Sequence, residues 1–373
     1  MKLTGDRVQL LESMSAVASG APARTPKPVL QNVKLTISQD GNASLLATDH
    51  EVSIHRRLGG VQTDEFGSVL LPAQRTLSIL KSISIDTVDV EVDNDKVTVT
   101  AGRSKFTMTT EPVDLFPEVE DFNAESYSVV SPSALRRLIR RTIFAADPES
   151  MRYALGGSLI VPGDGRLQFV ATDGRRLAIA EEDATHVGDV LQSGIQAVLP
   201  VKALKLIDRN LEPDGEPVHM AATASLASVQ AGNVTITTRL VEGRYPSYER
   251  VIPDHSPTTA TVTASTLLAA VEQATLATSE ETRGVDFAFD RDGLLASLNL
   301  TSRSEASTAD VTISVELDGE PVTASMDPRY IAEAIKTMGD TEPVAVRLID
   351  SKSAVVFVVD GFQYVVMPLM RNS

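Results

Sequence analysis

LPAQRTLSILK occupies residues 71–81, and two segments of the same design follow it, LPVKALKLI at residues 199–207 and MDPRYIAEAIK at residues 326–336. Each has a proline within its first three positions and then apolar side chains at helical spacing, which predicts a helix with proline in its first turn. The segments start 128 and 127 residues apart. This period indicates a triplicated domain, because the units of solenoid proteins are only about 20–50 residues long.

A second amphipathic segment lies upstream of each of these three, at residues 7–19, 131–146 and 264–278. Between the helical segments are short runs with the alternation of β-strands, as in 88–93, where valines alternate with carboxylates. The sequence therefore predicts an α+β fold of three repeated domains, each with two helices packed on antiparallel β-sheet. Polar and proline-rich linkers place the domains at residues 1–125, 126–254 and 255–373.

Length and composition agree with three domains. A chain of 373 residues leaves roughly 120 for each, enough to bury a core. The absence of cysteine excludes disulfides, thiolate catalysis and cysteine-ligated zinc, and it is compatible with the reducing cytoplasm, where we expect the protein to be located. No apolar run is long enough to cross a membrane, so no membrane association is expected.

Charge is sorted along the chain. The net charge is −16, which argues against a polyanionic partner, yet the six helical segments carry twelve basic and five acidic residues. Helical spacing gathers the cations on faces of two segments in particular, 131–146 and 199–211. The cationic side chains of these two segments are Arg136, Arg137, Arg140, Arg141, Lys202, Lys205 and Arg209, and Arg75 of the segment 71–81 is expected to belong to the same set.

Two interpretations of these cationic faces remain open. A single basic helix face is usually just solvated. Because such faces recur on corresponding helices of different repeats, they can instead line one surface that attracts phosphates without reading base edges. Binding of nucleic acid by such a surface is expected to be independent of sequence and sensitive to salt.

Several longer motifs are more specific than the charge pattern. They are FVATDGRRLA at 169–178, EGRYPSYERVIP at 242–253 and YVVMPLMR at 364–371, with GRSKF at 102–106 and RGV at 283–285 as further landmarks. Together they closely resemble the β sliding clamp family of bacterial DNA polymerase III, over essentially the whole chain. In that family two chains of three domains close head to tail into a ring, with helices around the hole and sheets outside.

The resemblance implies a function without intrinsic catalysis. A ring holds double-stranded DNA by encirclement, independently of sequence, and slides along it as the processivity subunit of a DNA-directed DNA polymerase, a nucleotidyltransferase complex. The partners implied are a second copy of the chain, the replicative polymerase subunit, the clamp loader and other proteins with clamp-binding motifs. No cofactor and no metal is expected.

The family binds partner motifs in an apolar groove between its second and third domains. The matching positions are Leu155, Thr172, Gly174, Arg175, Arg176, Leu177, Pro246, Arg250, Val251, Tyr330, Val365, Val366, Met367 and Pro368. Taken alone, residues 172–174 indicate a hairpin turn, and residues 47–50 repeat it in part, 124 residues earlier. The tail could be a frayed terminus, but a β-rich apolar run so close to the end favours pairing in a sheet.

Further site residues are implied by the resemblance. Arg24 and Tyr153 match positions that touch DNA. The first helix of the third domain, with Leu276 and Ala277, is expected to contribute apolar contacts to a subunit interface near Arg103 and Lys105 of the first domain.

Two other classes of function are alternatives for this sequence. The five histidines show neither an i, i+4 pair nor a zinc-site spacing, and the chain has no glycine-rich phosphate loop and no nucleophile elbow. Carboxylates from distant segments could still converge on a metal and make the protein a hydrolase. The other alternative is a clamp-like protein-interaction scaffold that does not encircle DNA.

Overall fold

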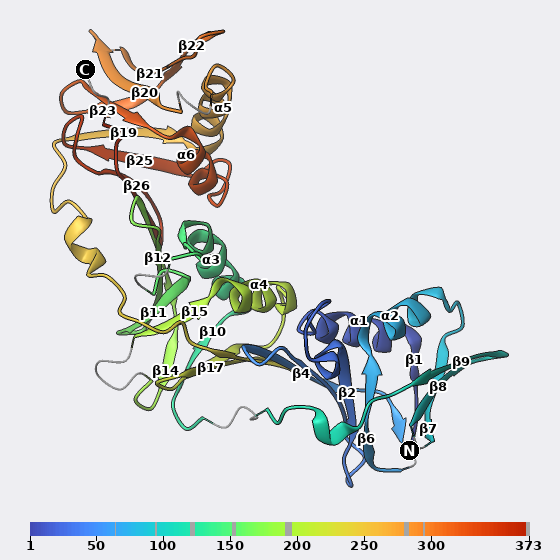
Figure 1. The fold of residues 1–373 in the computed structure, drawn as a ribbon. Helices are drawn as coiled ribbons and strands as arrows, with labels where there is room; N and C mark the ends of the chain where they lie inside the picture. Colours follow the sequence, from blue (N-terminus) through green and yellow to red (C-terminus); the bar gives the residue numbers. More distant parts are fainter. Residues whose placement is uncertain are drawn as a thin grey trace. The chain divides into compact units, whose positions relative to one another are not determined.

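The structure is a computed structural model that describes residues 1–63, 65–93, 95–119, 124–150, 154–190, 196–279, 283–293 and 295–370 (Figure 1). The chain folds into two compact units. Unit 1 comprises Met1–Ser133 and Ala184–Leu240, and unit 2 comprises Ala134–Asp183 and Val241–Ser373. The border between them crosses the expected second domain, so the domain limits drawn from the sequence remain a prediction.

The six predicted helical segments are all helical. Their bounds are α1 Arg7–Ala18, α2 Ala73–Ser82, α3 Pro132–Thr142, α4 Val201–Asn210, α5 Ala264–Thr275 and α6 Pro328–Ile335. Short 3₁₀ turns are η1 Pro28–Gln31, η2 Val113–Leu115, η3 Ile143–Ala145 and η4 Tyr248–Val251. The segment 131–146 thus ends as a 3₁₀ turn after α3. None of the helices in the described part of the chain is long and apolar enough to span a membrane.

Unit 1 contains two antiparallel sheets. A five-stranded sheet has the order β5-β1-β7-β8-β9, and a nine-stranded sheet the order β14-β10-β16-β17-β18-β4-β3-β2-β6. The bounds are β1 Lys2–Asp6, β2 Asn32–Ile37, β3 Ala43–Thr48, β4 Val52–Leu58, β5 Gln62–Thr63, β6 Gly67–Pro72, β7 Thr87–Asp93, β8 Lys96–Ala101, β9 Ser104–Thr109, β10 Tyr127–Val130, β14 Thr185–Val187, β16 Val218–Ala222, β17 Leu226–Ala231 and β18 Val234–Arg239. The strand β15, Ala197–Pro200, leads directly into α4.

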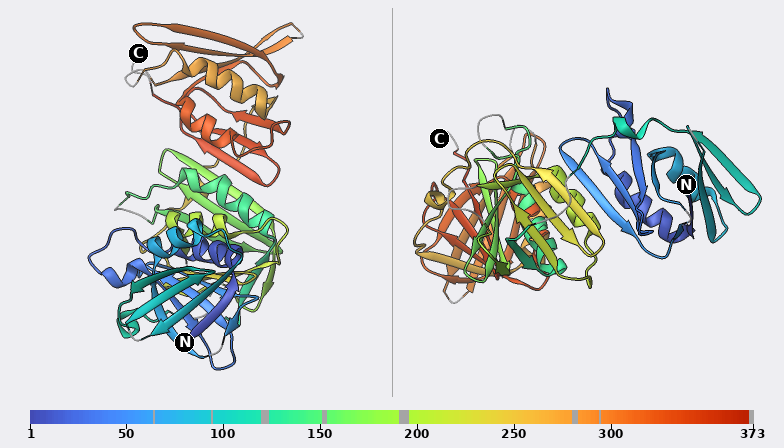
Figure 2. Two further views of the ribbon diagram at one scale, coloured as in Figure 1. Left: turned by 90° about the vertical axis from the view of Figure 1, so that its right-hand side faces the viewer. Right: turned by 90° about the horizontal axis from the view of Figure 1, so that it is seen from below.

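The helix α1 joins the two sheets of unit 1. It contacts β1 of the five-stranded sheet and β2, β3 and β4 of the other, and it packs beside α2 (Figures 1 and 2). Its buried face includes Leu10, Met14 and Val17. The alternation predicted for 88–93 is confirmed in β7, where Val88 and Val90 are buried and Glu91 is exposed.

Unit 2 repeats this arrangement. One antiparallel sheet contains, in order, β11-β12-β13-β27-β26-β25-β19-β23, and a four-stranded sheet has the order β22-β21-β20-β24. The bounds are β11 Gly157–Gly163, β12 Arg166–Thr172, β13 Arg176–Asp183, β19 Thr258–Thr263, β20 Val285–Asp292, β21 Leu295–Arg303, β22 Thr308–Ser314, β23 Glu316–Asp318, β24 Val322–Met326, β25 Pro343–Leu348, β26 Val355–Val359 and β27 Phe362–Val366. The helix α5 contacts β19, β21 and β22, and so both sheets, and packs beside α6 (Figure 2). The α+β prediction is confirmed.

Candidate functional site

The strand pair β13 and β27 brings two distant motifs together. The register pairs Arg176 with Val366 and Leu177 with Val365, so FVATDGRRLA and the tail are neighbours in one sheet. Beyond β27, the N–H of Met367 donates to the carbonyl of Arg175 at 3.0 Å. The N–H of Leu369 then donates to the carbonyl of Ser325 at 2.7 Å. A frayed tail is therefore wrong for residues 362–369, and the predicted sheet pairing is confirmed.

The turn between β12 and β13 is a tight hairpin, as predicted. The Thr172 hydroxyl accepts from the N–H of Gly174 at 3.1 Å and donates to the carbonyl of Arg176 at 2.6 Å. Gly174 has a φ of 84°, a left-handed conformation that glycine adopts without steric cost. The carboxylate of Asp173 accepts from the N–H groups of Arg175 and Arg176 at 2.9 and 3.1 Å. These bonds fix the direction in which the two arginines leave the turn.

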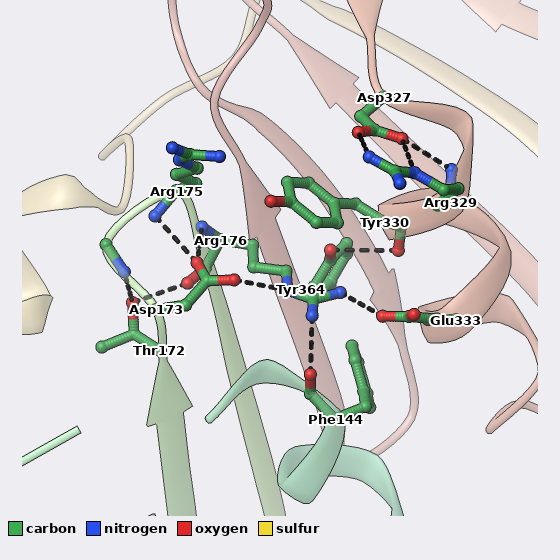
Figure 3. A network of polar contacts seen from close by, with 11 residues as sticks. Phe144, Thr172, Asp173, Arg175, Arg176, Asp327, Arg329, Tyr330, Glu333 and Tyr364 are labelled. Atoms are coloured by element: carbon green, nitrogen blue, oxygen red, sulfur yellow. Dashed lines mark hydrogen bonds and ion pairs between the residues drawn. The ribbon is translucent and has the colours of Figure 1, made fainter. Parts of the chain in front are cut away.

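The Arg176 guanidinium is the centre of a polar network (Figure 3). Its Nε donates to Asp173 at 2.9 Å, one terminal nitrogen donates to the carbonyl of Phe144 at 2.7 Å, and the other pairs with Glu333 of α6. The group also lies over the rings of Phe144 and Tyr330, at 5.4 and 4.3 Å from their centroids. Its side chain is only 9% exposed. Arg176 therefore connects the hairpin turn, η3 and α6.

The electrostatics keep Arg176 charged. Burial by itself lowers the pKa of the guanidinium, but the hydrogen bond to Glu333 and the negative charges of Asp173 and Glu333 outweigh it, so the pKa is raised overall. The buried Tyr364 of β27 lies beside this network and donates its hydroxyl proton to the carbonyl of Tyr330 at 3.0 Å. Burial raises the pKa of the Tyr364 phenol, so it stays a neutral donor.

The start of α6 is set by a second ion pair. Asp327 caps the helix by accepting from the N–H of Arg329 at 3.0 Å, and its carboxylate also binds the Arg329 guanidinium at 2.7 and 3.1 Å. Burial raises the pKa of Asp327, but the hydrogen bonds to Arg329 lower it by a larger amount, so the net pKa lies below the ordinary value. On the exposed side of the turn, a hydrogen bond to Tyr330 raises the pKa of Arg175. The cap therefore fixes the first turn of α6, and Arg175 reaches Tyr330 of that helix from the hairpin turn.

The motif 242–253 runs beside β12. Buried Tyr245 donates its hydroxyl proton to the carbonyl of Val170 at 3.0 Å, and Tyr248 donates to the Gln168 side chain at 3.2 Å. Burial raises the pKa of Tyr248 to about 12. The tyrosines anchor this segment against the sheet, whereas Arg250 and Val251 remain exposed in η4.

The predicted groove residues are therefore gathered in unit 2, where they differ in exposure. Those at the surface are Gly174, Arg175, Arg250, Val251 and Met367, with Arg176, Pro246 and Tyr330 half-buried. The buried ones are Leu155, Thr172, Leu177, Val365, Val366 and Pro368. Exposed Val251 and Met367, at 50% and 47%, provide apolar surface beside the arginines. Such a surface suits an extended peptide with apolar side chains.

Reasoning from sequence missed the residues that support this surface. Asp173 lies in the motif and could have been proposed from its place in the turn. Phe144, Glu333 and Asp327 come from other segments, and nothing in their local sequence indicates that they meet Arg176 or Tyr330.

The predicted cations of unit 1 are exposed. On α4 the exposed residues Lys202, Lys205 and Arg209 lie opposite buried Leu204 and Ile207, as the helical spacing predicts. Arg24 and Arg75 are also exposed. Lys202 is ion-paired with Asp49, and burial lowers its pKa. The cationic face of α4 is thus confirmed as a solvent-facing surface.

The arginines of α3, in unit 2, differ from one another. Arg140 is exposed and Arg136 is half-buried. Arg137 binds Glu182 through two nitrogens, at 2.5 and 2.7 Å, and this hydrogen bonding raises its pKa. Its charge is therefore largely balanced within the unit.

The expectation of a fourth cation at the surface of α3 is wrong for Arg141. Its side chain is 9% exposed, donates to the carbonyl of Asp360 at 2.8 Å, pairs with Glu342 at 3.4 Å and lies over the ring of Phe362. These partners hold the guanidinium inside unit 2, where it braces α3 against the β26–β27 turn. The expected DNA contact at Tyr153 lies outside the described residues.

Of the expected interface residues, three are exposed and one is not. Arg103 and Lys105 are exposed at β9, an edge strand of the five-stranded sheet, and Leu276 is 84% exposed at the end of α5. Ala277 is 4% exposed. Its expected contact with a second subunit stays a prediction, for a side chain that is buried in the single chain.

Comparison with known proteins identifies the family. Three sequence models of the DNA polymerase III beta subunit match in order: the N-terminal domain at residues 1–120, the central domain at 129–247 and the C-terminal domain at 249–370. Proteins named beta sliding clamp from Pseudomonas aeruginosa and Vibrio cholerae are 33% and 30% identical to the chain, over 99% of its length and all of theirs.

Solved structures agree over the full length of both chains. The crystal structure of the DNA polymerase III subunit beta from Pseudomonas aeruginosa has a TM-score of 0.90 at 32% identity. A sliding clamp from the same organism bound to griselimycin has a TM-score of 0.91 at 32% identity. The clamp from Bacillus subtilis, at 24% identity and a TM-score of 0.91, supports the fold alone. Motifs, fold and full-length relatives agree, and the chain belongs to the DNA polymerase III beta subunit family of bacterial sliding clamps.

Proposed function

We propose that two copies of this chain close head to tail into a ring around duplex DNA and give processivity to the replicative DNA polymerase. The observation that carries this proposal is the match of all three clamp domains, in order, on a chain whose helical segments carry more basic than acidic residues although its net charge is −16. The function needs no catalytic group, because a closed ring stays on DNA by topology. The proposed location is the cytoplasm, where bacterial DNA is replicated.

The exposed cations are the proposed DNA-facing groups. Lys205 and Arg209 of α4 and Arg140 of α3 are solvent-exposed, and Arg24, Arg75 and Lys202 add to the set. Lysine and arginine bind phosphates without reading bases, so contacts of this kind hold DNA loosely and allow sliding. Arg137 and Lys202 have smaller roles in this proposal because Glu182 and Asp49, respectively, balance their charges.

The ring is proposed to close between edge strands. The strand β9 ends the five-stranded sheet of unit 1, and β22 ends the four-stranded sheet of unit 2. The first carries Lys105 with Arg103 just before it, and the second carries Asp310 with Glu305 just before it. An exposed strand edge is a template for pairing with another chain, and opposite charges favour this pairing. A contact between two different surfaces that closes on itself gives a ring.

Partner proteins are proposed to dock on the surface around Arg175 and Tyr330, which we call the partner surface. The adjoining Val251 and Met367 would accept apolar side chains of an extended motif, and Arg175 would contact its polar groups or its backbone. The replicative polymerase subunit and the clamp loader are the partners proposed for this site.

The test is topological. The protein is loaded by a clamp loader onto nicked circular plasmid, the complex is isolated, and half of it is linearised. Loss from linear DNA with retention on the circle is the expected result. Retention on both forms would indicate direct binding, and failure to load at all would favour an interaction scaffold that does not encircle DNA.

A further inference from the structure

Unit 1 contains a cleft of about 250 Å³ that none of the proposed roles uses. Its walls are the turn between β3 and β4, the end of β18 and the segment of residues 117–119. We call it the N-terminal cleft. All its lining residues belong to unit 1, so it is distinct from the partner surface of unit 2.

The turn in the N-terminal cleft has the same hydrogen bonds as the turn at the partner surface. Thr48 accepts from the N–H two residues ahead at 3.1 Å, and so does Thr172 at 3.1 Å. Asp49 accepts from the N–H groups two and three residues ahead at 3.0 and 2.9 Å, and Asp173 does so at 2.9 and 3.1 Å. The residue after each aspartate has a positive φ, 78° at residue 50 and 84° at residue 174.

The strands beside the two turns also correspond. In β4 and β18, Val52 pairs with Thr238, and in β13 and β27, Arg176 pairs with Val366. Just beyond each of these pairs, one further backbone hydrogen bond joins the two segments. The N–H of residue 239 donates to the carbonyl of residue 51 at 2.9 Å, and that of residue 367 to residue 175 at 3.0 Å. The N-terminal cleft therefore occupies, in the first repeat, the position equivalent to that of the partner surface in the second repeat.

The charge of the two sites is reversed at the turn. Glu51 stands in the position of Arg175, and Glu118 on the opposite wall adds a second exposed carboxylate. The one lining arginine, Arg239, is exposed and donates its Nε to the carbonyl of His50 at 3.2 Å, so two lining carboxylates stand against one lining guanidinium. The carboxylates therefore favour a cationic occupant.

The apolar groups and the volume limit the size of that occupant. Half-buried Pro117, Val119 and Leu226 form one side of the cleft, whereas β18 contributes Thr237 and Thr238 in the positions of two buried valines of β27. A volume of about 250 Å³ is below the roughly 300–1,000 Å³ of pockets that enclose whole small ligands. The cleft has room for one or two side chains of an extended chain.

We propose that the N-terminal cleft is a second docking site, which takes a short extended peptide of a partner protein with lysine or arginine beside an apolar side chain. Its carboxylates bind the cation, and the side formed by Val119 and Leu226 takes the apolar group. A clamp with this site holds two kinds of motif per subunit, one on each unit. The proposal does not depend on encirclement of DNA.

The experiment uses the full-length protein with methyl-labelled valine and leucine. The probe is the amidated hexapeptide Ac-Gly-Lys-Leu-Lys-Gly-Ser-NH2, and its counterpart has glutamate in place of both lysines. We expect the lysine probe to shift the methyl signals of Val119 and Leu226 in a saturable way, and the glutamate probe to leave them unchanged. The double variant Glu51→Gln with Glu118→Gln is expected to weaken this binding about threefold to tenfold, because each exposed ion pair contributes modestly.

The matched control is Glu212→Gln with Glu216→Gln, which removes the same charge from exposed positions of unit 1 outside the cleft. It should leave the affinity unchanged within twofold. Three results would overturn the proposal: no shift at Val119 or Leu226 at millimolar lysine probe, equal shifts with the glutamate probe, or equal affinity in the two double variants. Shifts confined to the partner surface of unit 2 would also overturn it, and would leave the sliding-clamp function untouched.

Discussion

Arg176 offers the sharpest test of how unit 2 is held together. Replacing it by alanine removes hydrogen bonds to Asp173, Phe144 and Glu333 and leaves the carboxylate of Asp173, 16% exposed, without its cation. Breaking a buried ion pair by removing one partner costs about 3–5 kcal/mol. Glu333 is 50% exposed and recovers hydration, so the lower end applies, about 3 kcal/mol.

This magnitude predicts a measurable change in melting temperature. A loss of about 1 kcal/mol lowers the Tm by about 2–4 °C in a unit of this size, so Arg176→Ala should lower that of unit 2 by about 6–12 °C. Arg176→Lys keeps the charge but cannot reproduce the planar fork over the Tyr330 ring, so its Tm should lie between those of the parent and Arg176→Ala. Differential scanning calorimetry on the full chain is the assay, and hydrogen exchange of β13 and α6 assigns the loss to this site.

The matched control is Arg166→Ala on the neighbouring strand β12. Arg166 also pairs with carboxylates, Glu181 at 3.2 Å and the 91% exposed Asp183 at 3.5 Å, but its side chain is 51% exposed, and such solvent-screened pairs together contribute about 0–1 kcal/mol. Its Tm should fall by no more than about 4 °C. If Arg176→Ala and Arg166→Ala melt at the same temperature, burial does not strengthen the Arg176 network, and the reasoning is refuted.

Three further predictions concern the tail, the cationic face and the cap of α6. Truncation after Val366 is expected to abolish binding of a partner-derived motif peptide, measured by fluorescence anisotropy, while sedimentation still shows a dimer; full peptide affinity would place the partner surface elsewhere. Lys205→Glu with Arg209→Glu should weaken DNA binding and reduce the slope of log K against log salt by about 2. The control Lys96→Glu with Lys352→Glu, outside α4, should change this slope less. Equal slopes for the two double variants would remove α4 from the DNA-facing surface. Asp327→Ala should cost about 1–2 kcal/mol at neutral pH. Because the folded-state pKa of Asp327 is lowered, its contribution to stability is complete above the ordinary pKa of 3.8 and is lost as pH falls through the folded-state pKa. A stability difference between parent and variant that persists unchanged in acid would contradict this role.

The local elements of this protein could be predicted from its sequence because helices and strands have short periods. The spacing of apolar residues located all six helices, and the alternation at residues 88–93 assigned a buried and an exposed face of β7 correctly. The turn at Thr172 was also predictable, because the threonine and aspartate side chains accept from backbone N–H groups only two or three residues away and glycine adopts the positive φ of the turn.

Which charged side chains reach solvent was decided by the tertiary structure. The helical spacing of α3 shows that four arginines lie near one another, but not that Arg141 finds Asp360 and Phe362 more than 200 residues ahead. The partners of Arg176 likewise come from η3 and α6.

The similarity between the N-terminal cleft and the partner surface is likewise visible only in the tertiary structure. The sequence shows only a partial echo of threonine and aspartate, because those two side chains make the same turn bonds at both sites, whereas the rest of the likeness is backbone pairing between strands whose side chains mostly differ. A backbone hydrogen bond is indifferent to the side chain beside it, so the repeat preserves the geometry of the site and leaves its charge free to change. By itself, the sequence determined the periodic elements and their repetition, and the tertiary structure decided which distant charges meet and so which cations stay at the surface.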